Sequence, residues 1–148
     1  MGTPSSIIRT LQSQLQGDSN LGIVSDDYIF LGVRANVSKF PCIFLEPLRI
    51  EESEFVSTKQ EMFFNIGIIG FVKHLGTDKD DVIADSSLVG IMDLENRIKL
   101  AVDSDLTIGG EAIHTEIIET RYNYNSYPER SVEVEIRIRF RQTQGTRT

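Results

Sequence analysis

Few side chains in this sequence are of types that perform chemistry, and only one histidine has carboxylates close by. His74 lies four to seven residues before Asp78, Asp80 and Asp81, and imidazole with carboxylates is a combination that binds metal ions. The same aspartates open an expected helix, where they interact favourably with the positive end of the helix dipole. We therefore favour a strand end followed by a helix start over a metal site.

The remaining candidates are isolated from one another. His114 lies in an expected strand and is predicted to be a surface residue of a hairpin. Cys42 is the single cysteine, which excludes an internal disulfide and a thiolate metal cage, and its apolar neighbours predict a buried, inert thiol. The acidic pairs 26–27 and 51–52 are expected in solvated loops rather than in a cleft suited to acid–base catalysis.

Sequence motifs for common enzyme classes are also missing. The chain has no phosphate-binding P-loop, no GxGxxG, no HExxH, no GxSxG and no CxxC. We therefore expect no enzyme activity, no cofactor and no metal. An enzyme or small-ligand site remains an alternative, and a deep pocket lined by Tyr28, His74 or His114 would favour it.

Composition predicts one globular domain. The 148 residues are 40% apolar and 25% charged, with a formal net charge of −7. Such a chain builds one core, so we expect a single domain over 1–148 with a flexible tail from about 143. The negative charge disfavours a nucleic-acid-binding role. The N-terminus lacks the basic and apolar regions of a signal peptide, and no run reaches the ~18 apolar residues of a membrane span. The expected site of synthesis is a cytoplasm, with no membrane partner.

Local patterns predict an α+β fold. Thr3 and Pro4 form a helix start, and Ile7, Ile8 and Leu11 recur at helical spacing up to a stop at 17–18. The other expected elements are strands at 28–33, 42–48 and 60–73, an acidic exposed stretch at 51–54, a helix at about 77–102, and a hairpin of 112–124 with 131–143. They combine into a mostly antiparallel sheet of about four to five strands with two main helices packed on it.

The second expected helix, at about 77–102, has a less regular apolar pattern than the first. Val82, Val89, Met92 and Ile98 supply much of its apolar face, and Gly90 weakens its middle. The breaks that follow it are 103–105 and 109–110.

The strand at 61–73 is apolar on both faces. One face carries alternate residues from Met62 to Val72, and the opposite face carries Phe63, Ile69 and Phe71. A strand with one solvated face should be polar on that face. Either the strand is sandwiched within one subunit, or a second chain covers one of its sides.

The strand at 131–141 alternates strictly between apolar and charged residues. Charge pairing across the hairpin predicts its register. The predicted opposed pairs are Arg121 with Glu135, Glu119 with Arg137, Tyr122 with Val134, and Ile118 with Ile138. This register places an apolar row toward the core and a charged row outward.

The charged row has three interpretations. Arg137, Arg139 and Arg141 recur every second residue, and a solvated strand with cross-strand ion pairs is the first. In the second interpretation, the arginines of one copy dock on acidic residues of another copy. In the third, the arginines contact DNA. The residues that we regard as candidates for a subunit interface are Phe63, Ile69, Phe71, Ile113, Ile117, Arg137, Arg139, Arg141, Glu51, Glu52 and Glu54.

The order of elements resembles a known family. The segments PCIFLEP, QEMFFNIGIIGFV and RYNYNSYPERSVEVEIRIRF, with an amphipathic helix before them and an acid-opened helix between them, resemble the tail terminator (tail completion) proteins of long-tailed bacteriophages. The resemblance covers about 5–140 and rests on element order and strand character.

The resemblance implies a structural virion protein without enzyme activity or cofactor. Such proteins form a ring, expected here to have six copies, on the last ring of the tail tube at the head-proximal end of the tail. The ring contacts the tail tube protein and the head-completion or neck proteins, and genomic DNA passes through its lumen. Another neck, connector or baseplate component remains an alternative, as does a small-ligand-binding or enzymatic α+β domain.

Overall fold

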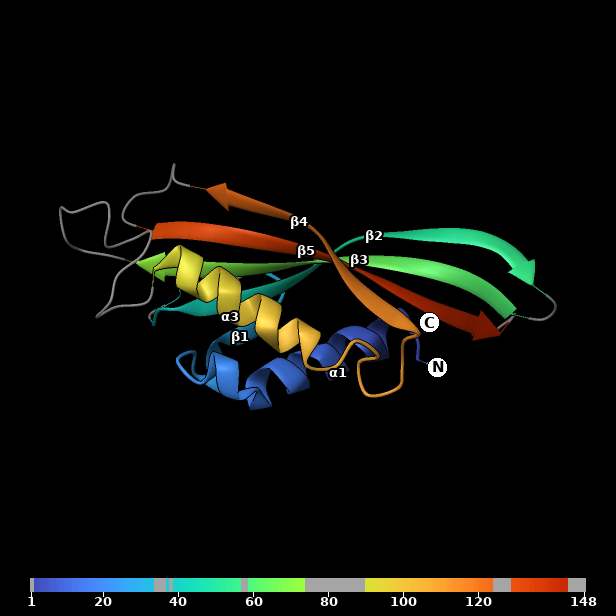
Figure 1. Ribbon diagram of the computed structural model, residues 1–148, viewed down its shortest axis with the longest axis horizontal. Helices are drawn as coiled ribbons and strands as arrows, with labels where there is room; N and C mark the ends of the chain where they lie inside the picture. The colour runs from blue at the N-terminus through green and yellow to red at the C-terminus, as the bar shows by residue number, and fades with distance from the viewer. Residues whose placement is uncertain are drawn as a thin grey trace.

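The structure, a computed structural model, describes residues 2–33, 37, 39–56, 59–73, 90–123 and 129–143. One five-stranded sheet carries both main helices on the same face, as Figure 1 shows. The elements are α1 (Pro4–Gly17), the 3₁₀ turns η1 (Ser19–Leu21) and η2 (Asp26–Tyr28), β1 (Ile29–Leu31), β2 (Cys42–Val56), β3 (Lys59–Lys73), α3 (Ile91–Asp103), β4 (His114–Asn123) and β5 (Glu129–Thr143). The predicted α+β class is confirmed, including the C-terminal hairpin.

The strand order is β1-β2-β3-β5-β4. The short β1 pairs in parallel with the start of β2, and every other neighbouring pair is antiparallel. Strands β2, β3 and β5 are each 15 residues long. They extend past the helices, so part of the sheet has no helix over it (Figure 1).

Helix α1 forms as its sequence predicts. The Thr3 side chain accepts from the Ser6 backbone N–H, and Ser6 Oγ accepts in return from the Thr3 N–H at 2.9 Å. This capping box satisfies N–H groups that have no partner within the helix, and Pro4 fits the first helical turn. The buried face consists of Ile7, Leu11 and Leu15.

Helix α3 starts later than the sequence predicts. Gly90 is its N-cap, with φ −82° and ψ 168°, and this extended backbone cannot lie within a helix. The predicted continuous helix over 77–102 is therefore wrong, although residues 74–89 themselves lie outside the described part of the chain. Ile98 is fully buried as expected, whereas Met92 is 49% exposed and does not belong to the packed face.

The core lies between the sheet and the two helices. Alternate residues of β3 and β5, among them Ile66, Ile68, Ile136 and Ile138, point to this face and are fully buried. The predicted apolar row of β5 is confirmed.

Strand β2 continues through the position where a break was predicted. Pro47 pairs with Ile66, and the chain then inserts Leu48 as an extra residue before Arg49 pairs with Asn65. Proline is tolerated because no described strand pairs with β2 on its outer side at this point. The acidic stretch at 51–54 is therefore part of a strand and not a turn.

The register of the C-terminal hairpin differs from the predicted one. Arg121 lies opposite Glu133, and Glu119 lies opposite Glu135, a shift of two residues. Ile118 is an extra residue in a bulge and is 41% exposed rather than buried against Ile138.

Candidate interaction surface on the open face and edges of the sheet

The sheet face opposite the helices, here called the open face, is a mosaic of charged side chains. Arg137 donates to Glu51 Oε2 at 2.8 Å, and its guanidinium carbon lies 4.4 Å from the centre of the Phe63 ring. Arg139 donates to Glu61 Oε2 at 2.9 Å. The predicted arginine row therefore pairs with acidic residues of its own chain.

Arg121 is a second centre of ion pairs on this face. Its guanidinium contacts Glu119 Oε2 at 2.6 Å and Glu135 Oε1 at 3.0 Å, and it also donates to Glu133. The Asn65 amide donates to Glu135 at 2.9 Å. These contacts link β3, β5 and β4 across the open face and bury Asn65 completely although no described helix covers it.

The charges on the open face stabilise one another's ionised forms. The hydrogen bond from Arg139 is the main reason why the pKa of Glu61 is lowered, and the charges of Arg139 and Arg141 add to the effect. The Arg139 side chain is 43% exposed, so water screens the pair and its contribution to folding is small. The pairs set the pattern of charge on this surface more than they stabilise the fold.

One end of the open face is aromatic. Tyr28, Phe30, Phe44 and Phe71 form a chain of ring contacts, with centroid distances of 5.7, 5.4 and 5.2 Å. Ile69 lies opposite Phe44 on the same face. The apolar outer side of β3 is thus partly covered by residues of this chain.

The structure groups some of the predicted interface candidates and separates others. The candidates that share the open face are Phe63, Ile69, Phe71, Arg137, Arg139, Arg141 and Glu51. The predicted outward position of Ile117 is wrong, because Ile117 lies opposite Ile136 and packs against the core. The extra residue Ile118 changes the alternation of β4, so that Ile117 and Glu119 point to opposite faces of the sheet. Ile113 precedes β4 and is half-buried, Glu52 lies opposite Met62 on the helix side of the sheet, and the Glu54 side chain lies outside the described residues.

Strands β2 and β4 carry a matching feature that was not predicted from the sequence. Each has a one-residue bulge whose extra residue is apolar and exposed: Leu48 in β2 at 39% and Ile118 in β4 at 41%. A charged residue follows each one, Arg49 in β2 and Glu119 in β4. In both strands the extra apolar residue is followed by a charged one, as in ordinary strand alternation. The sequence therefore gives no sign that a bulge is present.

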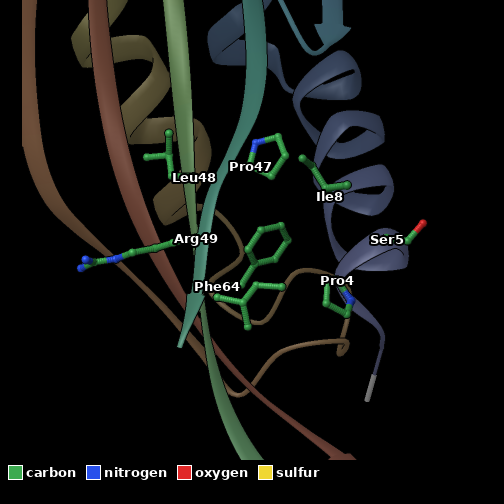
Figure 2. A pocket seen from close by; sticks show the side chains of 8 residues that line it. Pro4, Ser5, Ile8, Pro47, Leu48, Arg49 and Phe64 are labelled. Atoms are coloured by element: carbon green, nitrogen blue, oxygen red, sulfur yellow. The ribbon is translucent and has the colours of Figure 1, made fainter. Parts of the chain in front are cut away.

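A groove of about 440 Å³ runs beside the β2 bulge, between β2 and the first turns of α1. Figure 2 shows Phe64, Pro47, Ile8 and Pro4 around this space, with Arg49 directed away from it. Its lining is mostly apolar, and it contains no histidine or carboxylate. The groove suits an apolar side chain better than a catalytic reaction.

The other candidates that the structure describes lie on strands that are not neighbours in the sheet. Cys42 is buried in β2 and forms no disulfide, and His114 lies exposed on the edge strand β4. Among the residues that the structure describes, no three metal-ligating side chains cluster. No described helix has the length and apolarity needed to cross a membrane. His74, Asp78, Asp80 and Asp81 lie outside the described part of the chain.

Comparisons with known proteins identify a fold. No family model matches the sequence, and no curated protein matches it either. A solved chain from the virion of a native gene transfer agent (GTA) particle has a similar structure, with a TM-score of 0.63 and 11% sequence identity. The match covers 89% of this chain and 92% of that one. The chain therefore has a fold that also occurs in the virion of a gene transfer agent particle.

Proposed function

We propose that this chain is a structural virion protein that caps the end of a tail tube as a ring, with six copies as the expected number. The observation that carries the proposal is the fold shared with a virion chain over nearly the full length of both chains. The order of elements, which resembles tail terminator proteins, supports the more specific role.

The surface of the subunit supports a role in assembly. Among the described residues, β4 pairs only with β5, and beyond Leu45, where its pairing with β1 ends, β2 pairs only with β3. Unpaired strand edges of this kind are ready templates for another chain. The two edges differ in sequence, so contacts between them are heterologous and generate rings or filaments rather than closed dimers. A ring protein needs two such unlike surfaces.

We further propose that the ring has no catalytic role and lets DNA pass without holding it. The net charge of −7 repels a phosphate backbone. On the open face, the arginines that could attract phosphate are paired with Glu51 and Glu61. In this proposal the ring contacts the tail tube on one side and a head-completion or neck protein on the other.

The native mass of the purified protein, measured over a range of concentrations with negative-stain imaging of the main species, tests the proposal. A six-copy ring with a central hole that binds the end of tail tubes from the same particle is the expected result. A ring that ignores tube ends but binds portal-side proteins would assign the chain to another part of the neck. A monomer that binds neither would overturn the proposal.

A further inference from the structure

The two edges of the sheet are complementary to each other. β2 has no described neighbour on its outer side beyond Leu45, and β4 has none along its length. Each edge presents a bulge with an exposed apolar residue followed by a charge, Leu48 and Arg49 on one side and Ile118 and Glu119 on the other. The charges are opposite in sign.

We propose that β4 of one copy adds to the β2 edge of the next copy, with Glu119 opposite Arg49, so that the sheet continues from subunit to subunit. The inference rests on the proposed ring and specifies how its subunits join. The occupant of the β2 edge is therefore a second copy of this chain.

Strand directions permit this pairing. β2, β3, β5 and β4 are antiparallel in turn, so β4 runs opposite to β2 within one subunit. A rotation that keeps the strand direction places β4 of one copy beside β2 of its neighbour in antiparallel orientation. Every joint in the ring is then the same antiparallel pair that the subunit itself uses.

Charge selects the register. Within a subunit, Glu46, Gly67, Glu135 and Glu119 lie in one row across the sheet, so joining two copies without stagger would place Glu119 opposite another Glu46. A shift of one row places Glu119 opposite Arg49 instead, and it brings Arg121 opposite Glu46. The pairing ends at Arg121, because the next residues of β2, Leu45 and Phe44, already pair with β1. A sheet that closes on itself needs such a stagger.

The partners are available for this contact. Arg49 contacts Glu51 at 3.3 Å, and its side chain remains 60% exposed. Glu119 contacts Arg121 at 2.6 Å, and its side chain remains 55% exposed. The shift places Glu116 opposite Glu51, but Arg137 already contacts that carboxylate at 2.8 Å, which reduces the repulsion.

The apolar residues fit the same register. Ile118 comes to lie beside Ile50, which is 42% exposed, and Leu48 lies on the other side of the Arg49–Glu119 pair. Ile50 and Leu48 both line the groove between β2 and α1. Pairing the edges thus covers three of the exposed large apolar side chains of the subunit.

A disulfide test can detect the joint directly. In the variant Arg49→Cys/Glu119→Cys the two thiols of one chain are about 14 Å apart, because three strand spacings separate them, and they cannot bond within that chain. Between copies they are opposed. Mild oxidation should give a ladder of covalent oligomers up to the full ring, and the native Cys42 is buried. Each single variant, Arg49→Cys or Glu119→Cys, should give no ladder.

Charge reversal gives an independent measure of the same contact. Arg49→Glu and Glu119→Arg should each lower assembly by at least tenfold in the concentration for half-assembly, and the double reversal should restore most of it. Arg9→Glu and Asp103→Arg make the same kinds of change at exposed positions on the helices and should leave assembly unchanged.

The outcomes separate this inference from the proposed function. A ring that forms without the ladder, or that ignores both reversals, overturns the edge pairing alone. Dimers from Arg49→Cys by itself would show that two β2 edges meet, and would also overturn it. A ladder in a ring that never binds tube ends supports the pairing and counts against the terminator role. A chain that stays monomeric with and without tail tubes overturns both.

Discussion

At the scale of single residues, Asp105 organises the loop between α3 and β4. Its carboxylate accepts from the Gly109 N–H at 2.8 Å, from the Thr107 N–H at 3.0 Å, and from the Gln14 side chain at 2.8 Å. These hydrogen bonds, the one from Gly109 first, lower the pKa of Asp105 to about 2. The hydrogen bonds that connect the loop to α1 are therefore strongest while Asp105 is ionised.

We expect Asp105→Asn to lower the free energy of unfolding by about 1–2 kcal/mol at pH 7. The folded-state pKa lies below the ordinary value of 3.8, so the charged form stabilises the protein above about pH 4 and this contribution is lost as the pH falls toward 2. Urea unfolding at pH 7 and at pH 2.5 measures the difference, which should shrink at the lower pH. Asp103→Asn, at an exposed position, is the control. If the difference in unfolding free energy between Asp105→Asn and the unaltered protein did not change with pH, the charge of Asp105 would not have the role assigned to it.

Ile138 tests the burial of the alternating strand. Its side chain is 0% exposed, so Ile138→Asp places a carboxylate in the core and should abolish soluble folding. Arg141→Asp puts the same group on the open face of the same strand, where the arginine side chain is 48% exposed, and should cost less than about 1 kcal/mol. Expression yield and thermal unfolding compare the two. A folded, thermally unchanged Ile138→Asp protein would contradict the assigned face.

At the scale of elements, two glycines of β3 report how closely each face is packed. A Cβ at Gly70 would lie 2.6 Å from Leu94 Cδ2 and 3.2 Å from Ile98 Cδ1, both on α3. A Cβ at Gly67, on the open face, would meet the flexible end of Glu133 at 2.8 Å. The helix approaches the sheet so closely only because residue 70 has no side chain.

Gly70→Ala should therefore destabilise the protein by about 1–3 kcal/mol, because α3 must shift to make room. Gly67→Ala should change stability by less than about 0.5 kcal/mol, because the Glu133 side chain can rotate away. Both changes add one methyl group to the same strand, so denaturant unfolding compares the two faces directly. Equal effects would mean that backbone entropy, and not packing by α3, decides the outcome.

The elements also show how far the sequence specifies the fold. Strict alternation in β5 predicts its two faces correctly, because a one-residue error would bury the whole charged row. The register of the hairpin could not be predicted in the same way. Arg121 is long enough to reach both Glu133 and Glu135, so the charge pattern fits two registers two residues apart, and the bulge at Ile118 shifts the pairing without any glycine to mark it.

Local signals failed where neighbouring structure overrides them. An acidic stretch following Pro47 predicts a turn, yet pairing with β3 extends β2 to Val56. Gly90 reads as a weak position inside a helix, whereas its extended backbone makes it the start of α3. The candidate surface could be predicted only in part. Alternation shows which residues of one strand share a face. The ion partners on adjacent strands depend on the registers between strands, which the sequence alone leaves open.

At the scale of the whole molecule, the distribution of charge matters more than its total. The net charge is −7, yet the open face carries Arg49, Arg121, Arg137, Arg139 and Arg141. Acidic partners on the same face pair with each of these arginines. A phosphate backbone near this face therefore has to compete with carboxylates that are already in place.

The intact protein should leave a short DNA duplex unshifted in a gel at physiological salt, because the arginines of the open face are already paired with carboxylates. Glu51→Gln/Glu61→Gln removes the acidic partners of Arg137 and Arg139 and should produce measurable binding at low salt that weakens steeply as salt is added. Asp27→Asn/Asp93→Asn changes the net charge equally at exposed positions elsewhere and should not. Only the Glu51→Gln/Glu61→Gln variant frees adjacent arginines, so a DNA shift with both variants would assign the effect to net charge. A DNA shift with the unaltered protein would mean that the carboxylates do not mask the arginine row.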